Sequence, residues 1–109
     1  MTIGSPVRFM LSGKRRTGLV LEFRHGFDGV VRALVAYGTS QTAPPSEVVV
    51  VVLPKKSGTA CLQMPKITSF RSGNFALVRL SDLEVLPGVC SPAFMLKIRA
   101  LLAAALGQQ

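Results

Sequence analysis

The chain contains no tryptophan, one tyrosine, one histidine and two cysteines among its 109 residues. So few aromatic rings argue against a wide stacking platform of the kind that RNA-recognition sheets use. Two cysteines are too few for a disulfide framework, and neither Cys61 nor Cys90 lies in a pattern typical of zinc binding. We therefore expect two buried free thiols, no metal and no cofactor.

Long apolar runs and acidic residues are also scarce. No stretch of about 18 apolar residues exists, and the first ten residues lack the apolar centre of a signal peptide. We therefore expect a cytoplasmic protein with no membrane span. Five acidic residues stand against 13 Lys and Arg, which gives a net charge of +8. Such a charge favours nucleic acid, an acidic protein segment or an anionic membrane surface as partner, although it also promotes solubility alone.

What is present is a series of short apolar segments separated by turn residues. Asp28-Gly29 is typical of a hairpin turn, and residues 12–16 and 38–45 are predicted to be loops. The unbroken apolar run 48–53 is typical of a buried central strand. Strands are predicted over residues 6–10, 17–24, 30–37, 48–53, 59–64, 75–80 and 83–86.

The C-terminal segment has a helical pattern instead. Ser91-Pro92 combines a capping hydroxyl with a proline suited to the first helical position. Strong helix formers follow, and Gly107 is typical of a helix end. Residues 1–109 are thus predicted to form one mainly β domain, a small barrel or sandwich with a C-terminal helix at about 92–106. The apolar face of that helix would contain Phe94, Ile98, Leu101, Leu102 and Ala105.

Four stretches together resemble the PemK/MazF-like toxin family. Residues 4–9 (GSPVRF) are similar to the family's opening strand, and residues 16–22 (RTGLVLE) to its Arg-Pro-x-Leu-Val-Leu stretch. Residues 34–41 (LVAYGTSQ) resemble the strand that runs into a Thr-Ser loop. Downstream, residues 82–87 (DLEVLP) followed by a helix are also similar.

This resemblance implies an SH3-like barrel with a C-terminal α-helix. It also implies a toxin of a toxin–antitoxin pair: a homodimeric, metal-independent endoribonuclease that cuts single-stranded RNA and is neutralised by an acidic antitoxin protein. The net charge of +8 suits both an RNA backbone and an acidic inhibitor.

Cleavage without a metal uses the neighbouring 2′-hydroxyl as nucleophile, and it needs groups that move protons and stabilise charge on the phosphate. By resemblance, Thr39 and Ser40 would position the phosphate or a catalytic side chain. The catalytic candidates are therefore Thr39, Ser40 and Arg71, and the RNA-binding candidates are Arg15, Arg16, Gln41 and Lys66.

The family's catalytic arginine has no direct counterpart. Cys61 and Gln63 stand at the matching positions, and a shifted alignment offers Lys66 or Arg71 instead. Two alternatives therefore stay open beside the ribonuclease. One is a catalytically inactive SH3-like barrel that binds nucleic acid or an acidic protein segment. The other is an assembly protein in which the valine run and the helix form an oligomer interface.

Overall fold

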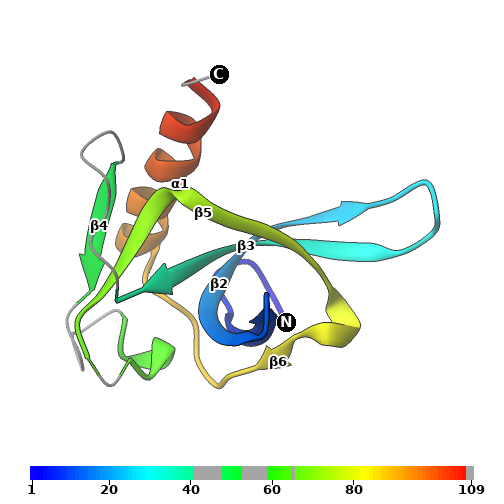
Figure 1. The fold of residues 1–109 in the computed structure, drawn as a ribbon, viewed down its shortest axis with the longest axis horizontal. Coiled ribbons are helices and arrows are strands. Elements are labelled where there is room, and N and C mark those ends of the chain that lie inside the picture. The colour runs from blue at the N-terminus through cyan, green and yellow to red at the C-terminus, as the bar shows by residue number, and fades with distance from the viewer. Residues whose placement is uncertain (41–47, 53–58, 65, 108–109) are drawn as a thin grey trace.

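The computed structural model describes residues 1–40, 48–52, 59–64 and 66–107. All six strands belong to one antiparallel sheet of order β4-β5-β3-β2-β1-β6, and a single helix packs against it (Figure 1). The elements are β1 (Pro6–Leu11), β2 (Lys14–His25), β3 (Val31–Thr39), β4 (Val49–Val52), η1 (Ala60–Leu62), β5 (Thr68–Arg79), η2 (Leu80–Asp82), β6 (Glu84–Val85) and α1 (Pro92–Gly107).

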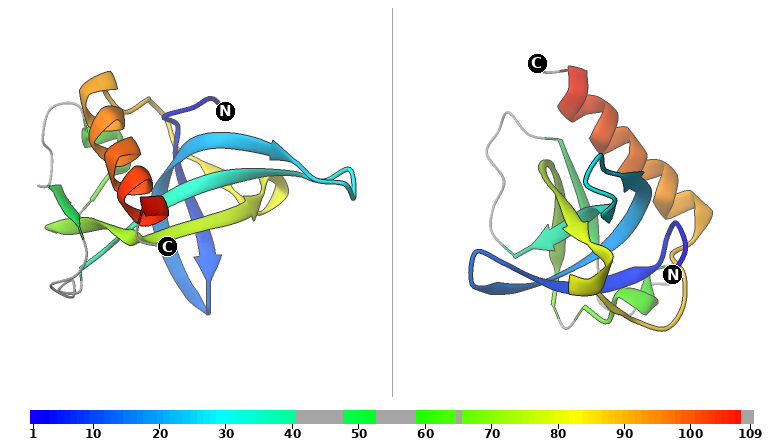
Figure 2. Two further views of the ribbon diagram at one scale, coloured as in Figure 1. Left: turned by 90° about the horizontal axis from the view of Figure 1, so that it is seen from above. Right: turned by 90° about the vertical axis from the view of Figure 1, so that its right-hand side faces the viewer.

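The sheet curls strongly, as the two views of Figure 2 show. It does not close, because within the described residues its edge strands β4 and β6 each pair with one neighbour only. The mainly β class with one C-terminal helix is confirmed. The predicted small barrel takes the form of a curled sheet that stays open between β4 and β6.

Both faces of the central strands are buried. In β2, Leu19 and Leu21 point into a core cluster beneath α1, whereas Val20 points into a second cluster inside the curl. In β3, Leu34 and Val35 divide between the two clusters in the same way. Side chains alternate across a strand, so burial of both faces accounts for the unbroken apolar runs at 19–21 in β2 and 33–36 in β3, where every side chain is buried.

The turn between β1 and β2 is tighter than the sequence predicts. Residues 12–16 are expected to be a loop, but only Ser12 and Gly13 connect the strands, and both have positive φ, of 52° and 78°. Two such residues give the backbone twist that a two-residue hairpin needs. The basic residues from Lys14 onward are therefore held in register on β2, opposite β1.

Strand β3 also extends further than predicted. Gly38 and Thr39 are expected to begin a loop, but they pair with Phe70 and Ser69 of β5 and belong to the strand. Ser40 forms a bend directly after it. The two prolines that indicate the loop lie later, at 44 and 45, outside the described residues, and so they do not limit the strand at residue 38.

The prediction of a buried central strand over residues 48–53 is wrong for the described part. Strand β4 lies at the edge of the sheet and pairs only with β5 there. Val51 is 57% exposed, whereas Val52 is buried and Val50 packs against the core cluster beneath α1. An apolar run does not tell an edge strand with one covered face from a central strand, because the difference depends on distant partners.

Residues 59–64 are not the predicted strand. They contain the 3-10 helix η1, in which the Leu62 N–H donates to the Thr59 carbonyl over 3.0 Å. Leu62 is fully buried in the core cluster beneath α1, and Gln63 has a left-handed φ of 55°. The short 3-10 helix places the Leu62 side chain in the core, which an extended strand would not need to do. The free energy gained by burying Leu62 outweighs the β propensity of its neighbours.

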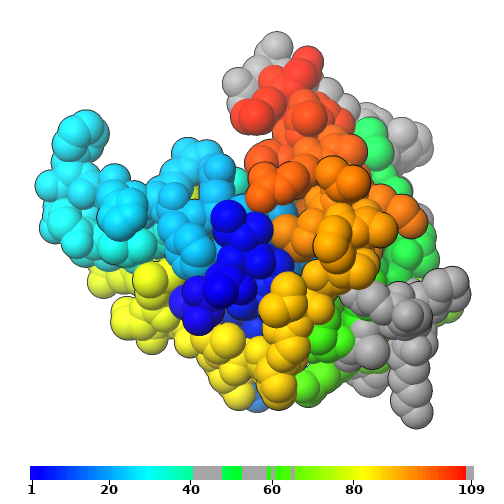
Figure 3. Space-filling view, turned by 180° about the vertical axis from the view of Figure 1, so that it is seen from behind, coloured from blue at the N-terminus to red at the C-terminus, as the bar shows by residue number. Residues whose placement is uncertain are grey.

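The C-terminal helix follows its sequence signals. The Ser91 hydroxyl accepts a hydrogen bond from the Phe94 N–H over 3.2 Å, as expected of an N-cap. Phe94, Ile98 and Leu101 are buried on the sheet, together with Met95. Figure 3 shows α1 crossing the face of the molecule opposite to that of Figure 1, with the β2–β3 hairpin projecting to one side.

The β2–β3 hairpin turn carries an acid-sensitive contact. Arg32 donates to Asp28 over 2.8 Å and the Val30 N–H donates to the same carboxylate over 3.0 Å, which lowers the pKa of Asp28 to about 2. A carboxyl whose pKa is lowered on folding stabilises the folded hairpin at pH values above its ordinary pKa of 3.8. This stabilisation is lost as the pH falls toward 2. We expect a carboxyl NMR titration to place the midpoint of Asp28 near 2.

The matched variant is Arg32→Gln, which keeps the length of the side chain and removes its charge. In this variant the Asp28 midpoint should move toward 3.8, because the hydrogen bond from Arg32 is the largest cause of the shift. Asp28 is 52% exposed and Arg32 28% exposed, at the end of a projecting hairpin, so the effect should stay in the hairpin and leave the melting of the whole domain nearly unchanged. A midpoint near 3.8 in the unaltered protein would contradict the contact.

Candidate functional site

One small hollow opens where the start of β2, the end of β3 and the start of β5 meet. It has a volume of about 150 Å³. The register explains the convergence, because Gly18 pairs with Tyr37 across β2 and β3, and Thr39 pairs with Ser69 across β3 and β5. The lining residues are Arg15, Arg16, Thr17, Gly38, Thr39, Ser40, Met64, Lys66 and Thr68.

Five of the seven residues predicted from the sequence to form the site line this hollow. They come from the start of β2, from the end of β3 with the bend that follows it, and from the segment just before β5: Arg15, Arg16, Thr39, Ser40 and Lys66. Gln41, the sixth, lies outside the described residues. Arg71, the seventh, does not line the hollow; it lies on β5 opposite Val49 of the edge strand.

Two glycines allow the strands to approach closely here. A Cβ atom added at Gly38 would lie 2.3 Å from Cγ2 of Thr68, and one added at Gly18 would lie 2.2 Å from the Ala36 carbonyl oxygen. Real Cβ atoms do not tolerate such contacts, so both positions require glycine. Four lining residues were not predicted from the sequence as parts of the site: Thr17, Gly38, Met64 and Thr68. Thr17 and Gly38 lie in the stretches that carry the family resemblance, whereas Met64 and Thr68 have no local signal because their place depends on this close approach.

Arg16 is the most enclosed cation of the lining. Its guanidinium carbon lies 5.7 Å from the centre of the Tyr37 ring, a distance suited to a cation–π contact. Its Nε atom is buried and has no hydrogen-bond partner among the described residues. Buried polar groups are almost always paired, so this unpaired N–H is unusual in a residue that lines the hollow.

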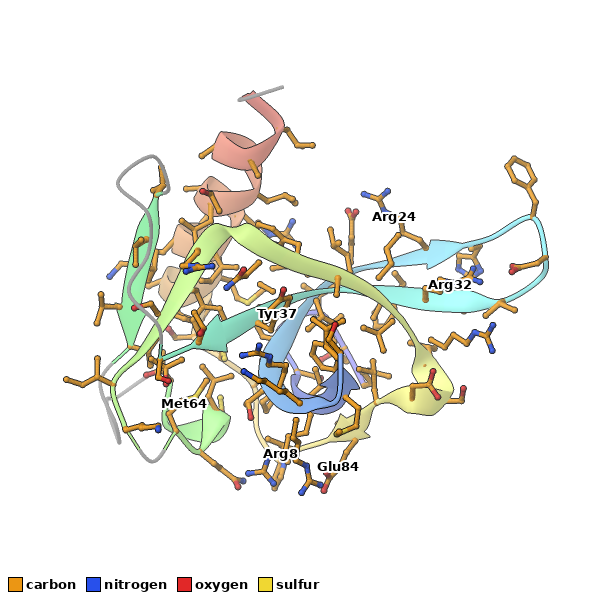
Figure 4. All side chains as sticks on the ribbon, viewed as in Figure 1. Arg8, Arg24, Arg32, Tyr37, Met64 and Glu84 are labelled. Carbon is orange, nitrogen blue, oxygen red and sulfur yellow. The ribbon has the colours of Figure 1, made fainter. Side chains whose placement is uncertain are left out.

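The remaining charges around the hollow are positive as well. Arg15 forms an ion pair of 2.9 Å with Glu84, but the two side chains are 67% and 53% exposed, so the pair is weak. Lys66 is exposed. No acidic residue is among the described residues that line the hollow. Figure 4 shows Tyr37 and Met64 on the side of the molecule away from the hairpin that carries Arg24 and Arg32.

Cys61 does not take the place of a catalytic arginine. It lies on η1, packed against the core cluster beneath α1, and not on a strand beside the hollow. Gln63 accepts a hydrogen bond from Arg8 over 3.1 Å and is not part of the lining either. Across the described ranges, no three His, Cys, Asp or Glu residues gather as a metal-ligand cluster.

The fold has a counterpart among solved structures. A chain of an endoribonuclease in complex with its cognate antitoxin, from a mycobacterial species, matches with a TM-score of 0.69. This protein has the same fold. The match covers 100% of this chain and 97% of that chain, at 20% sequence identity. The likeness therefore establishes the architecture, while the chemistry has to be argued from the side chains.

No family model and no curated protein matches the sequence. Within the described part of the chain, no helix has the length and hydropathy that a membrane span requires.

Proposed function

We propose that the protein is a PemK/MazF-like toxin, a metal-independent endoribonuclease that cuts single-stranded RNA. The observation that carries the proposal is the convergence of Arg16, Thr39 and Lys66 on one hollow, whose described lining contains no acidic residue. The fold is shared with a chain of an endoribonuclease–antitoxin complex. A cationic hollow attracts the phosphate backbone, and two adjacent hydroxyls at its wall, those of Thr39 and Ser40, can hydrogen-bond to it.

The proposed reaction breaks one phosphodiester bond by attack of its own 2′-hydroxyl. The 2′-hydroxyl gives up its proton to water and its oxygen bonds to phosphorus, which forms a cyclic phosphate end. The bond from phosphorus to the 5′-oxygen of the next nucleotide breaks, and that oxygen takes a proton from water to give a free 5′-hydroxyl end. Arg16 would bind the phosphate oxygens as negative charge grows on them, since its planar guanidinium matches their geometry. Thr39 would orient the phosphate, and Lys66 and Arg15 would bind neighbouring phosphates. On this assignment Arg16, not Arg71, supplies the catalytic arginine.

The test is incubation of the purified protein with a long single-stranded RNA in EDTA, followed by analysis of fragments and their ends. We expect discrete fragments with cyclic phosphate and 5′-hydroxyl ends. Thr39→Val, which keeps the shape and removes the hydroxyl, should reduce cleavage about 10- to 100-fold, because a hydrogen bond to the developing charge is lost. Thr39→Ser, which keeps the hydroxyl, is the matched control and should retain most activity.

A catalytically inactive binding module is the second candidate. It is favoured by the absence of a carboxylate or imidazole from the described lining, because these are the usual proton carriers. In a filter-binding assay, this candidate predicts that the protein retains intact RNA and that Thr39→Val loses the retention. That result would support the binding module and reject the ribonuclease proposal.

The proposal also includes an acidic antitoxin protein as partner and a homodimer. The net charge of +8 supports an acidic partner, and the matched chain comes from a complex with an antitoxin. Light scattering of the purified chain measures the dimer mass directly, and a monomer at micromolar concentration would remove that part of the proposal. Competition between RNA and an acidic protein segment for the hollow would be visible as inhibition of cleavage.

A further inference from the structure

The two cysteines meet in the folded protein although they are 29 positions apart. The Sγ atoms of Cys61, on η1, and Cys90, just before α1, lie 3.4 Å from each other. Both are free thiols. The expectation that they are free is therefore confirmed, while the expectation that both are buried holds for Cys90 only, because Cys61 is partly exposed.

The backbone on both sides holds this contact in place. The Cys90 N–H donates to the Gly4 carbonyl over 3.0 Å, and Cys61 is fixed by the turn of η1, which buries Leu62. Gly88 has a φ of +93°, and a Cβ atom there would lie 2.9 Å from Cβ of Cys61. The loop before α1 can therefore lie against Cys61 only because residue 88 is glycine.

The two sulfurs differ in access. Cys90 is 3% exposed in the core cluster beneath α1, and this burial, together with the contact to Cys61, raises the pKa of its thiol. Cys61 is partly exposed. Because the more exposed of two thiols meets a dissolved reagent first, we assign Cys61 as the sulfur that reacts first and Cys90 as the one that resolves.

We propose that Cys61 and Cys90 form a reversible intramolecular disulfide by exchange with a low-molecular-weight disulfide of the glutathione type. The Cys61 thiolate attacks one sulfur of the small disulfide, which breaks its S–S bond, releases one thiol and leaves a mixed disulfide on Cys61. Cys90 then loses its proton and attacks Cys61 Sγ, which releases the second thiol. The protein dithiol is oxidised by two electrons and the small disulfide is reduced to two thiols.

The bond would join η1 to the start of α1. It closes a loop that contains β5, β6 and Lys66, and a closed loop of this length restricts the unfolded chain strongly. Bond formation requires the sulfurs to approach from 3.4 Å to about 2 Å, a movement within reach of side-chain rotation. The proposal is independent of RNA cleavage, since neither cysteine lines the hollow.

The experiment titrates the reduced protein with mixtures of reduced and oxidised glutathione, blocks remaining thiols with a maleimide in denaturant, and measures intact mass. Under oxidising mixtures we expect the mass of a single covalent chain that carries neither maleimide nor glutathione. It should be two hydrogens lighter than the dithiol form, and dithiothreitol should restore the dithiol. Its melting temperature should rise by about 10 °C. Cys90→Ala should stop at one glutathione on residue 61, and Cys61→Ser should leave Cys90 unmodified while the protein is folded.

Three outcomes would overturn the proposal. The protein could keep both thiols under these mixtures, accumulate only the mixed disulfide, or form a disulfide between two chains instead. If a variant does not fold, a time course on the unaltered protein decides the order of reaction. Glutathione should appear on Cys61 before the internal bond, and its appearance first on Cys90 would contradict the assigned roles.

Discussion

Replacing Arg16 by alanine should lower the rate of RNA cleavage by about 100- to 1,000-fold, the usual cost of removing one preorganised donor from a site of developing charge. Arg16 lines the hollow beside Thr39, and its buried Nε has no partner among the described residues. Arg16→Lys should recover only part of the rate, because an ammonium keeps the charge but not the planar fork. Single-turnover kinetics with a defined RNA is the measurement.

The matched control is Arg24→Ala, an arginine of the same strand. Arg24 is exposed, forms an ion pair with Glu22 and lies on the projecting hairpin (Figure 4). Its loss should change the rate less than twofold. Arg71→Ala decides between the two arginines that compete for the catalytic role. A loss of 100-fold in Arg71→Ala with normal activity in Arg16→Ala would refute the assignment and restore the one suggested by sequence alignment.

Replacing Phe70 by alanine should destabilise the fold by about 3–5 kcal/mol, the range measured for buried aromatic residues. Phe70 is 1% exposed, and its ring lies edge-to-face with that of Phe94 at a centroid distance of 5.8 Å. The variant loses both the contact between β5 and α1 and the volume that fills the core beneath the helix. Urea unfolding followed by circular dichroism gives the free energy directly.

Phe27→Ala is the matched control, since the same side chain there is fully exposed at the hairpin tip. Its free energy of unfolding should change by less than about 0.5 kcal/mol. Equal losses in the two variants would show that Phe70 does not join helix and sheet as described. Phe70 pairs with Gly38 in the sheet register, and Gly38 lines the hollow. Phe70→Ala should therefore also weaken RNA cleavage at urea concentrations at which the variant is still folded.

Features fixed by neighbouring residues could be predicted from the sequence. The Asp28-Gly29 turn and the Ser91-Pro92 helix start depend on the local backbone and on one hydrogen bond each, so their residue types are sufficient signals. The mainly β class followed from apolar segments of strand length. The lining of the hollow by Thr39 and Ser40 agrees with the position that the family resemblance gave them, although their roles stay predictions.

Features that depend on distant partners could not be predicted. The edge position of β4 results from its pairing with β5, and η1 forms because Leu62 finds space in the core. By resemblance, a shifted alignment offered Lys66 or Arg71 for the catalytic cation, and nothing local shows which cation the register brings to the end of β3. The meeting of Cys61 and Cys90 needs the whole sheet, and no spacing rule for cysteines would have indicated it.

The order of the strands has a consequence for synthesis of the chain. Ribosomes extend a protein from its N-terminus at about 5–20 residues per second. The first two walls of the hollow, on β2 and β3, emerge early. The third is supplied by Met64, Lys66 and Thr68, and β5 and α1 emerge later still. A nascent chain that has reached only residue 60 therefore carries Arg16 and Thr39 without the hollow. Any activity of this site begins only when translation of the domain is nearly finished.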